Sequence, residues 1–330
     1  MQKSTLKKLS QTLGLSISTV SRALKDHPDI SEATRKRVKE LATAMEYEPN
    51  SYAVQLRTRQ SNVLGILVPT IENFFYDSFI AAIEEEARKY GYSVLIMQSR
   101  DNATIETSNL HLFRKNMIMG LFAALSLATE DMAPFRKLEE LEIPVIFADR
   151  VPDEKGFYSA CFTDKDAAAM AVDAIIAKKK KNVLALFDHP HLSITKNRKE
   201  AFVNAFKRKA PKIKLRVDFT ESLEPSREIA ISALTSSSPP DVIFCMNDLI
   251  MIGVMQAIHA LKLKVPGDIA VITISNGFMP HMYNPPITYI ETSGSKLGKL
   301  AFAQMLARLK GETIPENVFV ESILVKGNSL

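Results

Sequence analysis

Hydrophobic residues recur at two different spacings, and the change in spacing divides the chain into two parts. Up to about residue 48, apolar residues recur every three to four positions, as in short amphipathic helices. From Val63 onward, short apolar runs alternate with longer stretches of helical spacing. Such alternation of predicted strands and helices favours parallel sheets with helices on both faces, which is an α/β fold.

A helix-turn-helix motif is predicted near the N-terminus. Leucines at helical spacing predict a first helix over residues 5–12. Gly14 suits the turn that follows, because glycine tolerates a positive φ. Ser16 can cap a second helix, from Ile17 to about Leu24. A short helix, a glycine turn and a second short helix are the components of this motif.

A third helix should complete a small all-α domain over residues 1–48. Ser31 can cap this helix, and Pro49 is expected to end it. Helical spacing alone leaves two interpretations open, a DNA-binding domain and a structural bundle with a solvated basic face. The distribution of charge along the chain helps to decide between these two interpretations.

The positive charge of the chain is concentrated in its first part. Residues 1–60 hold 11 Lys and Arg against 6 Asp and Glu, and the remainder is balanced, so the net charge of +5 lies in the first part. An anionic partner is therefore expected, either nucleic acid or a membrane surface. A membrane-surface helix needs a wide apolar face, whereas these short helices need their apolar residues to pack together. DNA is the favoured partner.

The N-terminal segment resembles the DNA-binding headpiece of the LacI/GalR family of bacterial repressors. The residues that carry the resemblance are Thr5-Leu6, Gly14, Ser16, Thr19-Val20-Ser21-Arg22, Ser31, Thr34-Arg35, Val38, Tyr47 and Pro49-Asn50. The resemblance implies that the second helix lies in the major groove, with Ile17, Ser18 and Arg22 at the base edges. Arg can bond guanine O6 and N7, and Ile can contact a thymine methyl. Phosphate contacts, which position the protein without specifying sequence, suit Thr5, Ser16, Thr19, Ser21 and Asn50.

Residues 49–61 are expected to link the headpiece to the rest of the chain. The stretch NSYAVQLRTRQ contains no Pro or Gly, so a helix is permitted, although its residues alone favour an ordinary polar linker. The family resemblance implies a hinge that becomes helical on DNA. Leu56 would then wedge apart a base step in the minor groove, Ala53 would allow close approach, and Arg57 joins the DNA-binding set.

Residues 62–330 are expected to form an effector-binding and dimerisation domain with two lobes, because about 270 residues is large for one such domain. Strand-like runs lie at 63–69, 92–98, 118–125, 143–149, 182–188, 214–219, 241–246 and 268–274, with a final strand at 320–327. The fold class is a two-lobed, doubly wound parallel-sheet core. By the family resemblance, lobe 1 spans about 62–160 and 290–320, and lobe 2 spans about 161–289 and 321–330.

The two-lobed core resembles periplasmic sugar-binding proteins, whose fold the LacI/GalR effector domain shares. Open parallel sheets bind ligands beyond the carboxyl ends of their strands. Matching segments are PTIENFFYDSFIAAIEEEARKYGY, FADR, MNDLIMIGVMQAI, VPGDIAV and NPPIT. The resemblance implies a small-molecule effector, expected to be a carbohydrate or a derivative, contacted by Phe75, Tyr76, Asp149, Arg198, Phe219, Asn247 and Ser275. Structural alternatives remain open, since Asp149 could cap a turn and Arg198 could lie on a helix surface.

Three positions depart from the family pattern around this cleft. Ser275-Asn276 stand where many members have an Asp, and Thr292 lies near a position that is often Gln. Phe74 follows Asn73 in place of a proline. A charged clamp for effector hydroxyls is therefore missing, so the effector is either less sugar-like or held by other residues.

Other classes of function have weaker support. No phosphate-binding loop occurs, Cys161 and Cys245 have no metal-ligand spacing, and His189 and His191 lack a third ligand, so we expect no cofactor and no enzyme activity. No apolar run approaches the roughly 18 residues of a membrane span, and no signal peptide is evident, so a cytoplasmic location is expected. A plain solute-binding protein and an α/β enzyme remain as alternatives.

The sequence thus favours a ligand-responsive, sequence-specific transcription regulator of the repressor type. No tetramer-forming tail follows the final predicted strand, so we expect a homodimer, with the helix at 75–90 as its surface. A dimer presents two headpieces, and its double-stranded operator should therefore be pseudo-palindromic.

Overall fold

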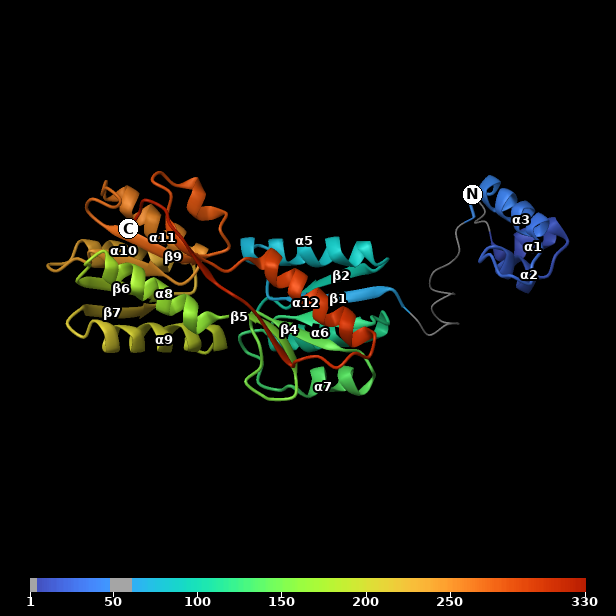
Figure 1. Ribbon diagram of the computed structural model, residues 1–330, viewed down its shortest axis with the longest axis horizontal. Coiled ribbons are helices and arrows are strands. Elements are labelled where there is room, and N and C mark those ends of the chain that lie inside the picture. Colours follow the sequence, from blue (N-terminus) through green and yellow to red (C-terminus); the bar gives the residue numbers. More distant parts are fainter. Residues whose placement is uncertain (1–4, 48–60) are drawn as a thin grey trace. The chain divides into compact units, whose positions relative to one another are not determined.

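The computed structural model describes residues 5–47 and 61–330, which belong to two compact units divided between Ser61 and Asn62 (Figure 1). The first unit contains α1 (Leu6–Leu13), α2 (Ile17–Ala23) and α3 (Glu32–Ala44). Its small core consists of the buried residues Leu9, Leu13, Val20, Ala23, Val38 and Ala42. The predicted three-helix bundle is confirmed.

Each helix of the first unit follows a capping hydroxyl residue, and Ser16 and Ser31 are the caps that the sequence predicted for the second and third helices. The side-chain oxygen of Thr5 accepts a hydrogen bond from Lys8 N at the start of α1. In the same way, Ser16 accepts from Thr19 N at α2, and Ser31 accepts from Thr34 N at α3. These bonds satisfy amide groups that have no partner within the helix. Gly14 has a φ of 64° after α1, as its position in the turn predicted.

The third helix ends earlier than the sequence suggested. It stops at Ala44, five residues before Pro49, so the expectation that Pro49 ends it was wrong. Glu46 adopts a φ of 48°, and the amide of Tyr47 donates to the carbonyl of Ala42 at 2.8 Å. A residue with a positive φ, followed by an amide that donates to a carbonyl in the last turn, ends a helix without any proline.

The second unit contains two six-stranded sheets, each of which forms the centre of one lobe. The sheet of lobe 1 is parallel throughout and has the strand order β11-β5-β4-β3-β1-β2. Its strands are β1 (Val63–Val68), β2 (Ser93–Gln98), β3 (Gly120–Ala123), β4 (Val145–Ala148), β5 (Tyr158–Phe162) and β11 (Asn317–Val320). Its helices are α5 (Phe74–Lys89), α6 (Ala103–Lys115), α7 (Ala133–Glu140) and α12 (Gly294–Leu309).

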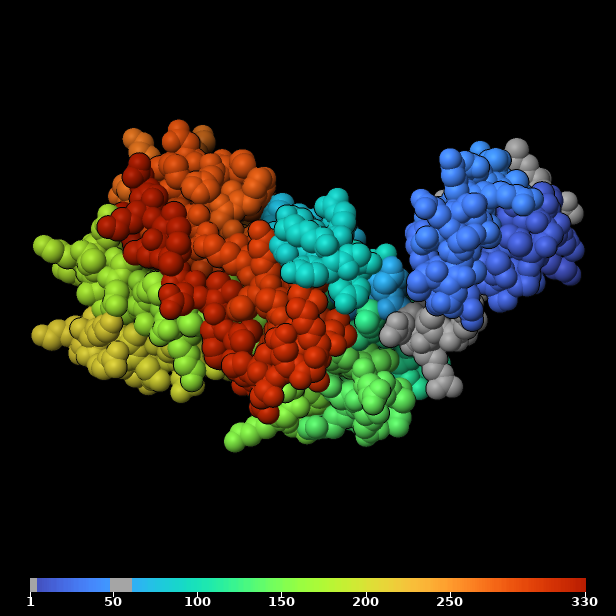
Figure 2. All heavy atoms as spheres, turned by 45° about the vertical axis from the view of Figure 1, so that its right-hand side comes forward, coloured from blue at the N-terminus to red at the C-terminus, as the bar shows by residue number. Residues whose placement is uncertain are grey.

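Helices cover both faces of this sheet. Core residues of α5 and α12, such as Phe79 and Leu297, pack with Ile66 on one face. Core residues of α6 and α7 pack with Leu67 and its neighbours on the other face. The space-filling view shows α5 and α12 side by side, although they are about 200 residues apart in sequence (Figure 2).

Lobe 2 has the strand order β12-β10-β9-β8-β6-β7, in which β12 alone is antiparallel to its neighbour. Its strands are β6 (Asn182–Phe187), β7 (Lys214–Phe219), β8 (Val242–Cys245), β9 (Ala270–Ser275), β10 (Thr288–Glu291) and β12 (Ile323–Val325). Its helices are α8 (Asp164–Ala177), α9 (Ser193–Lys209), α10 (Leu223–Leu234) and α11 (Asp248–Ala260), with the short 3-10 helix η1 (Met279–Met282). Helices α8 and α9 pack together, as do α10 and α11.

The chain passes between the lobes three times, after β5, after β10 and after β11. The final strand predicted at 320–327 is therefore corrected to two strands, because β11 ends in the first sheet and β12 begins in the second. Ser322 lies at this crossing and donates its amide to Thr163 Oγ1 at 3.2 Å. The strands β5 and β10, which directly precede the other two crossings, were not predicted.

Candidate functional site

One face of α2 carries the residues predicted to contact bases. Val20 and Ala23 are buried in the core of the first unit. Ile17, Ser18 and Arg22 lie on the other side of the helix and are exposed. An isoleucine that is 48% exposed on a small domain is free to contact an apolar group of a partner.

Hydroxyl groups cluster where α2 begins. The Ser16 hydroxyl lies 2.7 Å from that of Ser18 and 2.8 Å from that of Thr19. Ser21 is half-buried on the same helix, and Thr5 lies exposed at the start of α1. These groups can donate to phosphate oxygens, although Ser16 and Thr5 also cap their helices.

Two aspartates that follow α2 each form an ion pair with a basic side chain. Arg22 Nη1 lies 3.7 Å from Asp29 Oδ2, and His27 Nδ1 lies 3.4 Å from the same oxygen. Lys39 donates to Asp26 at 2.7 Å, and this hydrogen bond lowers the pKa of Asp26. Because both side chains of the Arg22 pair are more than half exposed, the pair is weak and a DNA base can replace it. The remaining predicted DNA contacts, Asn50, Ala53, Leu56 and Arg57, lie outside the described residues.

A pocket lies between the two lobes, at the carboxyl ends of strands from both sheets. Six of the seven residues predicted for effector binding line it, namely Phe75, Tyr76, Asp149, Arg198, Asn247 and Ser275. Lobe 1 supplies the first three residues, from the start of α5 and the end of β4. Lobe 2 supplies the others, from α9, from the segment after β8 and from the last residue of β9.

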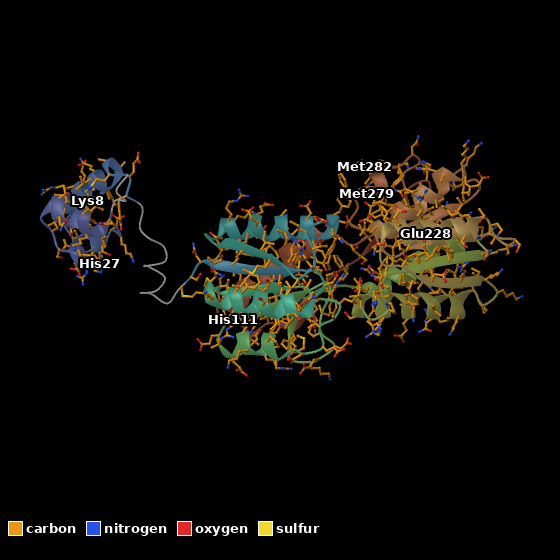
Figure 3. All side chains as sticks on the ribbon, turned by 180° about the vertical axis from the view of Figure 1, so that it is seen from behind. Lys8, His27, His111, Glu228, Met279 and Met282 are labelled. Atoms are coloured by element: carbon orange, nitrogen blue, oxygen red, sulfur yellow. The ribbon has the colours of Figure 1, made fainter. Side chains whose placement is uncertain are left out.

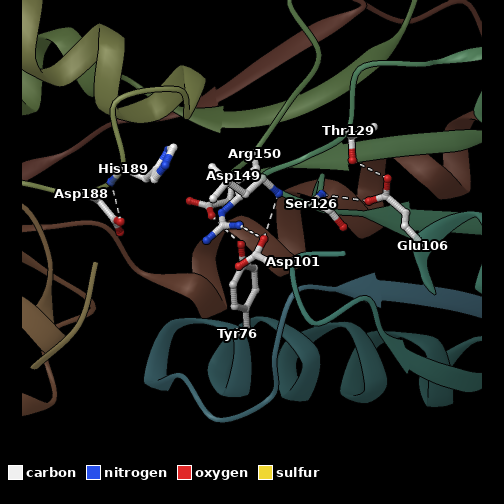
Figure 4. Close-up of polar contacts among 10 residues, drawn as sticks. Tyr76, Asp101, Glu106, Ser126, Thr129, Asp149, Arg150, Asp188 and His189 are labelled. Carbon is white, nitrogen blue, oxygen red and sulfur yellow. Dashed lines mark hydrogen bonds and ion pairs between the residues drawn. The ribbon is translucent and has the colours of Figure 1, made fainter. Parts of the chain in front are cut away.

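The lobe 1 wall of the pocket contains an aromatic side chain joined to a carboxylate (Figure 4). Tyr76 Oη donates to Asp149 Oδ2 at 2.8 Å, and Arg150 pairs with Asp101 beside them. Asp149 has a φ of 65°, and a bond from Arg150 N to Ala148 O closes a tight turn around it. Burial raises the pKa of Asp149. At this turn Asp149 lines the pocket.

Arg198 is an interior residue, which excludes the alternative that it lies on a helix surface. It is 4% exposed, and its Nε donates to Asp164 Oδ1 at 2.7 Å. Its Nη1 donates to the carbonyl of Met246 at 3.3 Å. Burial raises the pKa of Asp164, and the Arg198 charge opposes this effect. The guanidinium is thereby held rigidly at the wall of the pocket.

Two further aspartates line the lobe 2 wall, at strand ends where ligand-binding residues were expected, although neither was assigned as an effector contact. Asp188 Oδ2 accepts from Asn247 Nδ2 at 2.9 Å, and Asp248 Oδ1 accepts from the Ser275 hydroxyl at 2.5 Å. Asn247 also caps α11 through its Oδ1. Burial raises the pKa of both aspartates. Both lie at the carboxyl ends of apolar strands, which is where the rule for open parallel sheets predicts ligand-binding residues.

Phe219 lies outside this pocket, contrary to its expected place. It ends β7, the edge strand of its sheet, and it is 39% exposed. The ammonium group of Lys199 lies 5.4 Å from its ring centroid. The edge position explains the difference, since the pocket is built from strands nearer the middle of the sheet.

Among the described residues, two cysteines are free and no metal-binding group is found. No group of three His, Cys, Asp or Glu side chains among residues 5–47 and 61–330 could hold a metal ion. Burial raises the pKa of the Cys161 thiol to about 12 and raises that of Cys245 as well, so both thiols stay protonated at neutral pH. Over the same ranges, every helix is too short or too polar to cross a membrane.

Comparison with known proteins agrees with both units. Residues 5–50 match the model of bacterial regulatory proteins of the lacI family, and residues 61–326 match that of periplasmic binding proteins and the sugar-binding domain of the LacI family. The HTH-type transcriptional regulator DegA of Bacillus subtilis is 25% identical, over 90% of this chain and 88% of its own. The ribose operon repressor of Bacillus subtilis is 26% identical, over 94% of each chain.

Solved structures show the same fold. The lac repressor dimer bound to operator and the anti-inducer ONPF superimposes with a TM-score of 0.89, at 22% identity, over 99% of each chain. The relatives that match along nearly the whole length are transcriptional regulators and not enzymes. The chain therefore belongs to the LacI family and is a DNA-binding transcriptional regulator with a periplasmic-binding-protein-like effector domain.

Proposed function

We propose that this regulator represses transcription and that a small molecule in the interlobe pocket controls its affinity for an operator. The observation that carries the proposal is the pocket itself, which collects side chains from both lobes of a chain that begins with a DNA-binding headpiece. A ligand that binds one lobe arrangement more tightly than another shifts the population of that arrangement. The proposed parts are the headpiece at 1–48, the hinge at 49–61 and the effector domain at 62–330.

The proposed operator contacts follow the exposed face of α2. Ile17, Ser18 and Arg22 contact base edges in the major groove, and Arg22 leaves Asp29 to bond a guanine. The hydroxyls and the amide that contact phosphates are Thr5, Ser16, Thr19, Ser21 and Asn50. In the hinge, Leu56 enters the minor groove, with Ala53 and Arg57 beside it.

The proposed effector is a small molecule with several hydroxyl groups, in the class of sugars and sugar derivatives. Arg198 and Asn247 supply donors, Asp149 and Asp188 supply acceptors, and Phe75 supplies part of an apolar wall. Apolar walls with a few converging polar groups are typical of small-molecule sites. Phe219 is left out of this proposal because it lies outside the pocket.

A homodimer is proposed as the binding species, with the exposed side of α5 at its interface. Two headpieces related by a two-fold axis fit a pseudo-palindromic operator whose half-sites lie one helical turn, or a multiple of it, apart. The lac repressor structure similar to this chain is itself a dimer on operator DNA.

Selection of DNA from a randomised pool by the full chain tests the proposal. We expect a pseudo-palindromic sequence to be enriched, and a panel of sugars, nucleosides and sugar phosphates to contain a compound that changes its affinity. Arg22→Ala should lose the sequence preference, and Leu56→Ala should bind the selected DNA much more weakly while remaining folded. Failure to enrich any sequence at low salt, with and without the panel, would overturn the proposal.

A further inference from the structure

Asn276 connects the two lobes through its side-chain amide. It follows β9 in lobe 2, and its Nδ2 donates to the carbonyl of Phe74 at 3.1 Å. Its Oδ1 accepts from the Gly294 amide at 2.9 Å and from the Ser78 hydroxyl at 3.2 Å. These three partners belong to α5 and α12, which pack together on one face of the lobe 1 sheet.

Close packing of α12 against α5 makes this arrangement possible. A Cβ atom on Gly294 would lie 2.3 Å from Phe75 O and 2.4 Å from Ser78 Oγ. Glycine therefore lets the first amide of α12 lie next to α5, where a single side chain from lobe 2 can bond both helices.

An aromatic pair lies beside these hydrogen bonds. The rings of Phe74 in lobe 1 and Phe278 in lobe 2 have centroids 5.6 Å apart. Phe74 is 42% exposed and Phe278 is 53% exposed, so neither ring is held by a hydrophobic core. Their contact with each other removes apolar surface from water and joins the lobes a second time.

Contacts between the lobes near the start of α9 are weaker. Ser193 Oγ donates to the carbonyl of Val151 at 3.3 Å. Lys196 and Asp153 are 3.8 Å apart, with both side chains more than half exposed. Exposed ion pairs contribute little to stability, so these contacts are the less restrictive ones.

We propose that Asn276 is a positioning residue that holds the two lobes together. With Phe278 it forms the lobe 2 half of an interlobe clasp, and Phe74, Ser78 and Gly294 form the lobe 1 half. Phe74 and Asn276 also line the pocket, so the clasp controls the opening of the pocket on this side. An effector shifts the arrangement of the lobes by the difference in its affinity for the joined and separated states.

The chemistry of the side chain explains why asparagine suits this position. An amide donates and accepts hydrogen bonds at once, and Asn276 uses both abilities. An ionised aspartate could still accept from Ser78 and Gly294, but it would face the Phe74 carbonyl with no proton to donate. Asn276→Asp should therefore weaken the clasp without abolishing it.

Distance measurement between spin labels on the two lobes tests the proposal. His111 on α6 and Glu228 on α10 are exposed and are labelled in Figure 3. Both residues are replaced by cysteine in the full chain, and a spin label is attached to each. Cys161 is changed to alanine so that it takes no label, whereas Cys245 can stay because it is fully buried. The measurement uses neither DNA nor effector, so its outcome is separate from that of the proposed function.

We expect Asn276→Ala to raise the population of longer distances by about tenfold, because three hydrogen bonds are lost. Asn276→Asp should give an intermediate population. Phe278→Ala, which removes an exposed ring and leaves the core intact, should shift the distances in the same direction. Asn116→Ala, whose amide bonds its own helix, is the matched control and should leave them unchanged. A distance distribution in Asn276→Ala and Phe278→Ala equal to that of the unmodified chain would overturn the proposal.

Discussion

The ion pair between Arg198 and Asp164 shows how a single residue combines a structural role with a proposed binding role. Both side chains are almost completely buried, and they are 2.7 Å apart. Removing one partner of a buried pair leaves the other charge unpaired in a medium that solvates it poorly. The same pairing fixes the guanidinium at the pocket wall, so binding and stability depend on the same contact.

Arg198→Ala should lower the free energy of unfolding by about 3–5 kcal/mol, because Asp164 is left buried and unpaired. Urea unfolding monitored by circular dichroism measures the change. Lys196→Ala on the same helix is the matched control, since its ion pair is exposed and should contribute at most about 1 kcal/mol. Equal effects of the two variants would contradict the explanation.

Buried aspartates in the pocket should make stability depend on pH. Burial raises the pKa of Asp248 above its ordinary value of 3.8, so the folded chain binds this proton more tightly than the unfolded chain does. Its favourable contribution is complete below pH 3.8 and is lost as the pH rises through the raised pKa. Asp248→Asn should therefore become more stable, relative to the unmodified chain, as the pH rises through that range.

Urea unfolding of both proteins at a series of pH values checks this expectation. The matched control is Asp166→Asn, on the first turn of α8, whose side chain is exposed. A difference between the Asp248→Asn variant and the unmodified chain that does not change with pH would refute the proposed cause.

At the scale of elements, the close contact between α5 and α12 requires a residue without a side chain, Gly294, at the start of α12. Gly294→Ala should lower the free energy of unfolding by about 1–3 kcal/mol, because the new methyl group would overlap the backbone of α5. Gly267→Ala is the control, since its nearest neighbour would lie at an ordinary 3.7 Å. Thermal unfolding of the two variants measures the difference, and an unchanged melting temperature for Gly294→Ala would contradict the packing described here.

Long elements could be predicted from sequence, and short ones at the crossings could not. The helix predicted at 75–90 is α5, shifted by one residue, and most of the apolar runs are strands. Strands β5 and β10 were missed because their five and four residues mix apolar and polar side chains. The split between β11 and β12 depends on a crossing whose contacts, such as that of Ser322 with Thr163, lie far apart in sequence.

Most of the residues assigned to the pocket from the sequence line it, although not all of them do. The carboxyl-end rule and the family resemblance together located Asp149, Arg198 and Asn247, which line the pocket. The role of Asn276 could not be predicted, because its partners on α5 are about 200 residues away in sequence. Phe219 was assigned to the pocket because strand order, which makes β7 an edge strand, cannot be derived from local patterns.

For the whole molecule, the concentration of positive charge in the first 60 residues predicts a strong effect of salt on DNA binding. Each phosphate contact by a basic side chain releases counterions, so affinity for the selected operator should fall by orders of magnitude between about 50 and 200 mM salt. Fluorescence anisotropy with labelled DNA measures this slope. Residues 62–330 alone, whose charges balance, serve as the control and should show no such binding.

The three passages of the chain between the lobes also determine the order in which the protein can fold during synthesis. The headpiece and the first five strands of lobe 1 leave the ribosome early, but α12 and β11 follow only after nearly all of lobe 2 has been made. Until then, the sheet face that Leu297 and Phe302 later cover stays open to water. Nascent chains therefore carry a DNA-binding domain followed by an unfinished, aggregation-prone lobe, which makes them natural clients for chaperones.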